Sequence, residues 1–505
     1  MTQRALPFKY EESKKTKSMT NFSGLLPYVE FLHRMNFFKL VKSCVQVHGG
    51  NQGWLDSQIL SNLLLLNLSG GECPEDINRL EEDKGLCKSI NYLEKNLLGK
   101  ECQSKLDSRF RSSKGRKRCF ASANAIRNYM EAFHNEEAEA LRVYGEGYIP
   151  ESNHHLDGLY LLNSHFLKFM QKNNRNEIAT IDGDAVLVES EKSEAFFTYK
   201  KFRGYQPLNM YWSEQGLVGH SEFRDGNVPA GHQIKRVFSE TLDKLPQTVK
   251  RVRFRGDSAA YQYEMMDYCE NGDNERFGRI EFSISCDISD GFKRSVLEVK
   301  PEEWQEIYRE IGKGIKIKTG QQWAEVPFVG SVQSPDYRYI AIRELKEHQR
   351  SLPGFEEPKL PFPNYEEYGV RYKLSGFVTN MDWEGEELIH WSRKRCGRGE
   401  GVHSVMKSEL CGGKLPSGKF GANACWWQIM ILALNLNEMF KRLTLPRGWH
   451  NRRLKALRYW FINIAGRVEE GSRYLKVILG HGQRAFRLYQ ESRKRIAALA
   501  LVPDG

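Results

Sequence analysis

Residues 179–188 read Ala-Thr-Ile-Asp-Gly-Asp-Ala-Val-Leu-Val and place two carboxylates, Asp182 and Asp184, inside a run that otherwise has the apolar composition of a buried strand. Side chains alternate between the two faces of a strand, so both acids lie on the same face. Two like charges on an apolar face repel each other, and each is costly to desolvate, so the pattern requires a cation nearby. Periodicity alone does not separate the roles of the two acids.

The elements around this strand indicate its fold. Further strands are expected at 195–202 and in a hairpin over 208–223, followed by an amphipathic helix at about 234–245. The segment Thr-Val-Lys-Arg-Val-Arg-Phe-Arg-Gly-Asp-Ser at 248–258 reads as a strand that ends at Asp257. The elements follow the order of an RNase H-like α/β core: strands, then a helix, then a strand with an acid at its end. Many α/β domains share that order.

The composition limits the class of protein and its partners. At 505 residues the chain is expected to form about three domains. It has 75 basic and 64 acidic side chains, a net charge of +11, which favours an anionic partner: nucleic acid first, a membrane surface second. The most apolar runs, near 60–68 and 426–434, are shorter than the ~20 residues that span a bilayer, so no membrane span is expected. The N-terminus lacks the apolar core of a secretory signal, and a cytoplasmic location is expected.

Two segments concentrate positive charge. Seven Lys or Arg lie against one acid in 105–118, and 441–458 holds seven basic residues and no acid. Such runs are often only solvated surface, and that interpretation stays open beside phosphate binding. The candidate phosphate contacts are Arg111, Lys114, Arg116, Lys117, Arg118, Arg447, Arg452 and Arg453.

A third acid follows far along the chain: Glu400, within Arg-Lys-Arg-Cys-Gly-Arg-Gly-Glu-Gly-Val-His-Ser-Val-Met-Lys at 393–407. Phosphoryl transfer by two metal ions needs carboxylates that converge on Mg²⁺ or Mn²⁺ ions ~4 Å apart. The separations, 73 residues from Asp184 to Asp257 and 143 from Asp257 to Glu400, are too long for a local motif. On spacing alone, any one of these acids is more often a surface or capping residue than a ligand.

An ordered set of motifs carries a resemblance that covers nearly the whole chain. The chain resembles the DDE-type bacterial insertion-sequence transposases, in the branch related to piggyBac, which have an RNase H-like catalytic core interrupted by a β-rich insertion. The matching pieces are Leu63–Gly71 with Asp76, Ile181–Val186, Gly204–Leu208, Arg224–Asn227, Arg253–Ser258, Phe377–Asn380, Glu400 with Lys407, and Leu415–Asn423.

The resemblance implies a metal-dependent enzyme that binds the terminal inverted repeats of its own element and target DNA. It would cleave and transfer DNA strands by cut-and-paste, as a homodimer on double-stranded DNA, with two Mg²⁺ or Mn²⁺ ions. The catalytic, metal-binding acids of the family carry over to Asp184, Asp257 and Glu400. Glu386 is the alternative should Glu400 not serve. A bacterial cytoplasmic protein associated with the nucleoid is expected.

The sequence departs from the family pattern around the third acid. The family's helix reads Tyr-x-x-Arg-x-x-x-Glu-x-x-x-x-x-x-Lys, and Glu400 and Lys407 fit it. Arg393 occupies the Tyr position and Cys396 the Arg position, where the neighbouring Arg395 could substitute. A helix is expected at 383–395. Three glycines at 397, 399 and 401 each cost ~1 kcal/mol in a helix, so the helix that carries Glu400 is expected to begin only near it.

Other residues are assigned supporting roles. Asp184 is assigned the metal, and Asp182 is expected to hold a ligating water or an arginine, Arg253 or Arg255. Both arginines are also candidate DNA contacts. In relatives that form hairpin ends, an aromatic residue of the insertion stacks on a flipped base, which makes Trp304 and Trp323 candidates, although a Trp beside strands is more often part of a core.

The fold class expected is an α+β protein of several domains. In order, these are a flexible N-terminus (1–20), a helical DNA-binding or dimerisation domain (21–150), the first part of the RNase H-like core (151–285), a β-rich insertion (286–375), the second part of the core (376–445) and a basic helical C-terminal region (446–505). Two alternatives to a transposase stay open: a transposase-derived DNA-binding protein without catalysis, and an RNase H-like nuclease that cuts but does not join DNA.

Overall fold

The computed structural model describes residues 18–48, 53–97, 118–312, 314–328, 337–346, 362–367, 370–471 and 474–501. The chain divides into two compact units. The first unit comprises 1–135, 152–162 and 408–505, and the second comprises 136–151 and 163–407. Within the described residues, no helix combines the length and apolar character that a membrane span requires.

The first unit is mainly helical. Its helices are α1 (Leu25–Arg34), α2 (Phe37–Cys44), α3 (Asp56–Ser69), α4 (Ile77–Glu82), α5 (Lys84–Leu97), α7 (Ala123–Glu131), α14 (Phe420–Thr444), α15 (Leu454–Leu457) and α16 (Ala485–Ala498), and α9 (His154–Asn173) begins in it. The apolar helices α3 and α14 pack on each other and are buried on nearly all sides, as expected for helices without a polar face. The Tyr28 hydroxyl of α1 donates to Asn437 Oδ1 of α14 at 2.9 Å.

The prediction of a wholly helical C-terminal region is wrong. Strands β14 (Gly466–Glu470) and β15 (Leu475–Leu479) form an antiparallel hairpin, and β14 also pairs with β1 (Met19–Thr20). β1 falls at the end of the segment expected to be flexible. A partner more than 400 residues away in the sequence stabilises this hairpin, and no local pattern reveals such a pairing.

The second unit is built on a ten-stranded mixed sheet in the order β6-β5-β2-β7-β8-β13-β11-β10-β9, with β12 paired to β13. The strands are β2 (Ile178–Ala185), β5 (Leu208–Trp212), β6 (Leu217–Glu222), β7 (Arg251–Gly256), β8 (Glu281–Ser285), β9 (Gln305–Glu310), β10 (Lys316–Val326), β11 (Arg338–Leu345), β12 (Asn364–Glu367) and β13 (Val370–Thr379). β7 runs parallel to both β2 and β8, and the other pairs are antiparallel. Helices and a large mixed sheet confirm the mixed α/β class.

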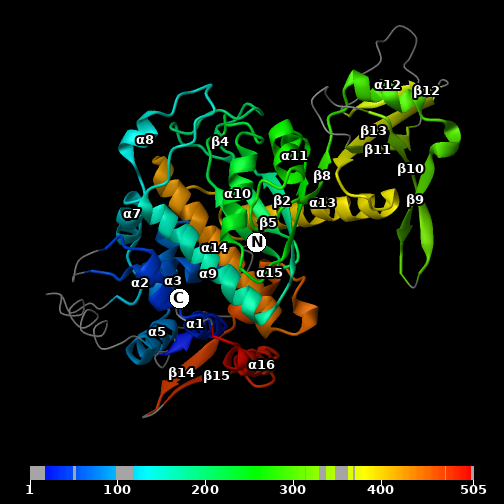
Figure 1. Cartoon of the computed structure of the whole chain (residues 1–505). Coiled ribbons are helices and arrows are strands. Elements are labelled where there is room, and N and C mark those ends of the chain that lie inside the picture. The colour runs from blue at the N-terminus through cyan, green and yellow to red at the C-terminus, as the bar shows by residue number, and fades with distance from the viewer. Residues whose placement is uncertain are drawn as a thin grey trace, which may run out of the picture. The chain divides into compact units, whose positions relative to one another are not determined.

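The strand expected at 195–202 does not form. A bridge joins Phe197 to Arg203, and the short strands β3 (Val188–Glu189) and β4 (Gly204–Tyr205) pair beside it. The strands expected in 286–375 do form, and they extend the same sheet, because β13 pairs with β8 through residues 377–379. Figure 1 shows β9 to β13 together, in green and yellow, with α13 beside them.

The helices of this unit are α8 (Glu136–Ala140), α10 (Ile234–Lys244), α11 (Tyr263–Glu270), α12 (Asp290–Glu298) and α13 (Gly385–Ser408), with the second half of α9. The expectation that a new helix begins near Glu400 is wrong, because α13 continues through all three glycines. Contacts on both sides of them hold the helix: Arg395 and His403 both approach Asp184, and Met406 is fully buried. Tertiary packing therefore outweighs the low helix propensity of glycine.

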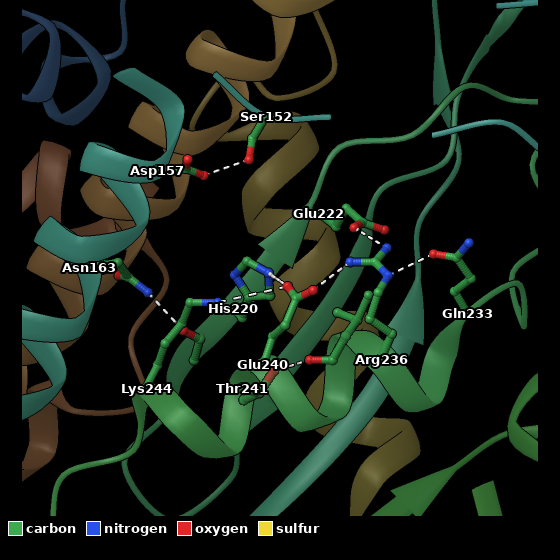
Figure 2. A network of polar contacts seen from close by, with 12 residues as sticks. Ser152, Asp157, Asn163, His220, Glu222, Gln233, Arg236, Glu240, Thr241 and Lys244 are labelled. Atoms are coloured by element: carbon green, nitrogen blue, oxygen red, sulfur yellow. Dashed lines mark hydrogen bonds and ion pairs between the residues drawn. The ribbon is translucent and has the colours of Figure 1, made fainter. Parts of the chain in front are cut away.

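A polar network fixes α10 to β6 (Figure 2). The buried His220 of β6 lies 3.2 Å from Glu240 of α10, and Arg236 donates to both Glu240 and Glu222. Burial alone would raise the pKa of Glu240, but the hydrogen bonds from His220 and Arg236 outweigh it and lower that pKa to about 2. The network keeps the charged face of α10 paired where it crosses the sheet.

Candidate active site

The strand register brings the first two acids together. β2 and β7 pair in parallel from Ile178 with Arg251 to Gly183 with Gly256, a constant offset of 73 residues. The next residue on each strand is an acid, Asp184 on β2 and Asp257 after β7. The ends of parallel strands meet at one edge of a sheet, so the two acids lie side by side there. The 73-residue separation in the sequence is the register of this strand pair.

Burial and neighbouring charges define the state of Asp184. Its carboxylate lies 3.5 Å from Arg395 Nη1 and 3.7 Å from His403 Nδ1. The pKa of Asp184 is raised to about 6, chiefly by burial; Arg395 opposes the rise, and Asp257 and Asp182 add to it. Asp257 lies at the start of the short helix Ser258–Ala260 and accepts a hydrogen bond from the Ala259 backbone at 3.1 Å. Arg395 is therefore the cation placed directly beside the Asp184 carboxylate.

Asp182 has a different partner. It accepts two hydrogen bonds from Arg255, at 2.6 and 2.8 Å, and both side chains are almost fully buried. Arg255 also donates to the Trp391 carbonyl of α13 at 2.6 Å and lies 4.8 Å from the centre of the Trp391 ring. Burial raises the pKa of Asp182, although Arg255 opposes the shift. The pair joins β2, β7 and α13, and the arginine is one of the two partners expected for Asp182.

α13 carries the third acid past this edge of the sheet. Glu400 belongs to α13, while its side chain lies outside what the structure describes. His403 and Lys407 follow it by three and seven residues and so share its helix face. His403 approaches Asp184, and the Lys407 ammonium lies 3.4 Å from the Leu187 carbonyl. The side chains of His403 and Lys407 on α13 are therefore directed to the segment that carries Asp184.

Two residues of this site were not anticipated from the sequence. Asn209 lies opposite Asp184 on β5, accepts from Ser221 at 2.6 Å and lies 3.4 Å from His403 Nε2. The pKa of His403 is lowered to about 4, chiefly by burial and also by Lys407 and Arg395, so the ring is neutral at pH 7. The spacing from Glu400 could have indicated His403. Asn209 required the strand register.

The acids fit a divalent cation. Among the side chains that the structure describes, which exclude that of Glu400, no group of three or more His, Cys, Asp or Glu is arranged to hold a metal. The two described acids at the strand ends are hard oxygen ligands of the kind that Mg²⁺ and Mn²⁺ prefer. The raised pKa of Asp184 reports a cost of ionisation that a bound cation would remove.

The first half of α13 packs on the added strands. Ile307 of β9, Trp323 of β10 and Ile342 of β11 form a core with Leu388 and Ile389 of α13. Trp323 is 5% exposed, and a Cβ on Gly385, the first residue of α13, would lie 2.1 Å from its ring. Trp323 is thus fixed in the core that holds the helix.

Trp304 is also buried, at 7% exposure, and Arg343 lies 4.0 Å from the centre of its ring. Stacking of Trp304 or Trp323 on a flipped base stays a prediction, and it would require the ring to leave its packed position. Each ring has a structural role in the described arrangement that accounts for its burial.

The candidate DNA contacts fall into three groups. Positions 111, 114, 116 and 117 lie outside the described residues, and Arg118 donates to Asn78 and to the Phe120 carbonyl. Arg255 is occupied by Asp182, and Arg253 pairs with Glu281 at 2.6 Å. Three candidates in the first unit have exposed side chains: Arg447, Arg452 and Arg453, the last bonded to Glu409.

A comparison with known protein families places this chain in one of them. The sequence profile described as Transposase DDE domain group 1 matches residues 11–501. Among solved structures, the fold is similar to that of piggyBac transposase in a cryo-EM synaptic complex with hairpin DNA, at 10% identity and a TM-score of 0.41, over 86% of this chain and 78% of that chain. No curated protein matched the sequence.

Proposed function

Because the chain belongs to the group 1 family of DDE transposase domains, we propose that it cleaves and rejoins DNA at the ends of a mobile element. Membership makes it an enzyme of DNA transposition in general terms. The observation that carries the specific proposal is the in-register placement of Asp184 and Asp257 at one sheet edge, with α13 crossing it. Its DNA substrates would be terminal inverted repeats and a target duplex, held by a homodimer.

Asp184, Asp257 and Glu400 are the residues that would hold divalent cations, two Mg²⁺ or Mn²⁺ by this proposal. Bound there, such ions would activate an attacking hydroxyl and stabilise the leaving oxygen. Residues of the chain itself hold in place the strands and the helix that carry these acids. Arg255 fixes α13 against β2 and β7 through Asp182 and the Trp391 carbonyl.

Arg395 and His403 would hold the Asp184 carboxylate from the α13 side. His403 is neutral at pH 7, so it adds no positive charge beside Asp184, and Arg395 is the cation at that carboxylate. Lys407, at the end of the same helix face, lies nearer the surface, where it could contact a phosphate.

The test compares cleavage, joining and binding in one series. Full-length protein is incubated with labelled duplexes that carry the inverted repeats flanking its gene, with Mg²⁺ or Mn²⁺. Asp257→Asn and Glu400→Gln should abolish cleavage and leave DNA affinity within about twofold, since the ligands contact ions and not bases. Glu281→Gln, a change in the acid that pairs with Arg253 on the neighbouring strands, is the matched control and should cleave normally.

The outcomes separate the open alternatives. Cleavage and joining that both depend on Asp257 and Glu400 support the transposase. Cleavage without joining would favour a nuclease on the same fold. Specific binding without cleavage by the unmodified protein, in either metal, would favour a DNA-binding protein derived from a transposase.

A further inference from the structure

A short π-helical turn in the first unit presents two aromatic side chains to solvent. The turn comprises Arg458–Ile462 and is closed by the hydrogen bond from Asn463 N to the Arg458 carbonyl at 2.8 Å. Phe461 and Ile462 are fully buried, whereas Tyr459 is 71% and Trp460 44% exposed. Their rings meet edge to face, with centres 4.9 Å apart. Such π turns are rare and occur frequently at functional sites.

The inner side of this turn is tightly held. Arg458 donates to the carbonyls of Asn67, Leu68 and Glu409. The backbone of Gly24 donates to the Ile462 carbonyl at 3.2 Å, and a Cβ at Gly24 would lie 2.0 Å from the Phe461 oxygen. The two exposed rings therefore project from a fixed backbone, so little conformational entropy is lost when they bind a partner.

The positive charge of the segment around the turn indicates which kind of partner the two rings would bind. From 441 to 467 the sequence holds eight Lys or Arg and no Asp or Glu. Arg452 lies 4.6 Å from the centre of the Trp449 ring, and Arg447, Arg452 and Lys455 are exposed. Aromatic faces that rise among cations are the combination that binds single-stranded nucleic acid: the cations contact phosphates, and the rings stack on unpaired bases.

We propose that Tyr459 and Trp460 form a stacking site for unpaired bases of DNA, flanked by phosphate contacts from Arg452 and Lys455. We call these four residues the stacking platform. The inference deepens the proposed function, because DNA processing at element ends exposes unpaired nucleotides, and it rests on that function only for the choice of DNA. A membrane surface is disfavoured, because α15 and this turn together span only Leu454–Ile462 and offer no long amphipathic helix.

The experiment measures binding in EDTA, so that no cleavage occurs. Full-length protein is titrated against a labelled blunt duplex, the same duplex with a single-stranded extension, and single-stranded DNA. The Tyr459→Ser/Trp460→Ser variant should lose about 5- to 150-fold in affinity for the two probes with unpaired bases and less than about twofold for the blunt duplex. The salt dependence of this variant's DNA affinity should equal that of the unmodified protein, because no phosphate contact is removed.

Two matched variants sharpen the result. Arg452→Gln/Lys455→Gln should lower the log–log salt slope on single strands by about 1.4, because each phosphate contact contributes about 0.7. Tyr263→Ser removes an aromatic ring of comparable exposure, 46%, that lies beside the acid Asp267, and it should change none of these affinities. Both aromatic sites are exposed, so thermal unfolding of the variants should match that of the unmodified protein.

Several results would overturn the inference. If the Tyr459→Ser/Trp460→Ser variant lost equal affinity for the blunt and the extended duplex, or lost none for either, base stacking by the platform would be ruled out. A smaller oligomer with unchanged DNA affinity would assign the platform to contact with a second copy, and lost binding to anionic vesicles with DNA affinity intact would assign it to a membrane. Failure of the proposed function is distinguishable, because a protein that binds unpaired DNA through the platform but never cleaves keeps this inference and loses the other.

Discussion

The acidic pocket, lined by Asp182 and Asp184 of β2 and by Arg395 and His403 of α13, and the basic segment at 441–467 use charge in opposite ways. In the pocket, the buried Asp182 and the half-buried Asp184 are each set against a particular arginine, Arg255 and Arg395. In the basic segment, cations and aromatic rings are left exposed on a rigid backbone. Groups that must meet ions at fixed distances are buried and positioned, whereas groups that meet a long anion are exposed. Changes in the pocket should therefore alter rates, and changes in the basic segment should alter affinities.

The largest expected effect separates the two acids of β2. Asp184→Asn should be inactive at any Mn²⁺ concentration, because it removes a ligand at the strand end. Asp182→Asn should be slowed about 10- to 100-fold and partly rescued by excess Mn²⁺, because Asp182 acts through Arg255 and α13. Strand cleavage across a Mn²⁺ titration measures both. Rescue of the Asp184 variant alone would mean that the two roles are reversed.

Glu386 was the alternative to Glu400, and the structure makes it a poor one. Its carboxylate accepts a hydrogen bond from the Tyr308 backbone of β9 at 2.7 Å. It precedes Glu400 by fourteen residues, or about 21 Å along the helix. Retained cleavage in Glu400→Gln would therefore point to an acid other than Glu386.

The second effect tests Arg255 as the link between the strands and α13. Arg255→Lys keeps the charge but loses the two-point contact to Asp182 and the contacts to Trp391, so it should lower the free energy of unfolding by more than about 1 kcal/mol, up to the about 3–5 kcal/mol that full loss of one partner of a buried pair costs. Arg253→Lys is the matched control, since it changes an arginine on the same strand that pairs with Glu281 and lies over Trp383; it should cost less than about 1 kcal/mol. Urea unfolding measures both, and equal losses would contradict the special role of Arg255.

How far the sequence predicts this site depends on the range of the contacts. The strand ends at Asp184 and Asp257 can be predicted from the local alternation of apolar and polar residues and from the residues that end each strand. Arg255 was one of two partners expected for Asp182. The continuity of α13 was missed, because the three glycines lower local propensity while the contacts of Arg395 and His403 are long-range. Asn209 and the β14–β15 hairpin depend on pairings between segments distant in sequence, which one sequence does not display.

A third effect concerns the cost of keeping Asp184 charged. Its pKa is about 6 in the folded protein against 3.8 for a free carboxyl, so ionisation destabilises the fold fully above pH 6 and not at all below about 3.8. Asp184→Asn should therefore stabilise the metal-free protein by about 1–3 kcal/mol at pH 8, with the gain shrinking as the pH falls towards 4. Urea unfolding in EDTA at several pH values measures this. A gain independent of pH would show that the charge is not its cause.

The smallest effect compares two arginines that were both candidate DNA contacts. Arg452 is exposed beside Trp449, so Arg452→Gln should weaken binding to every duplex and lower the log–log salt slope by about 0.9, the share of one phosphate contact. Arg253 is held by Glu281, so Arg253→Gln should leave the slope unchanged. A fourfold rise in salt then separates the two variants by only about 3.5-fold in affinity, so the slope must be measured over a full titration. Equal slopes for the two variants would show that exposure in the basic segment does not mark a phosphate contact, and the contrast between the buried and the exposed region would no longer hold for DNA binding.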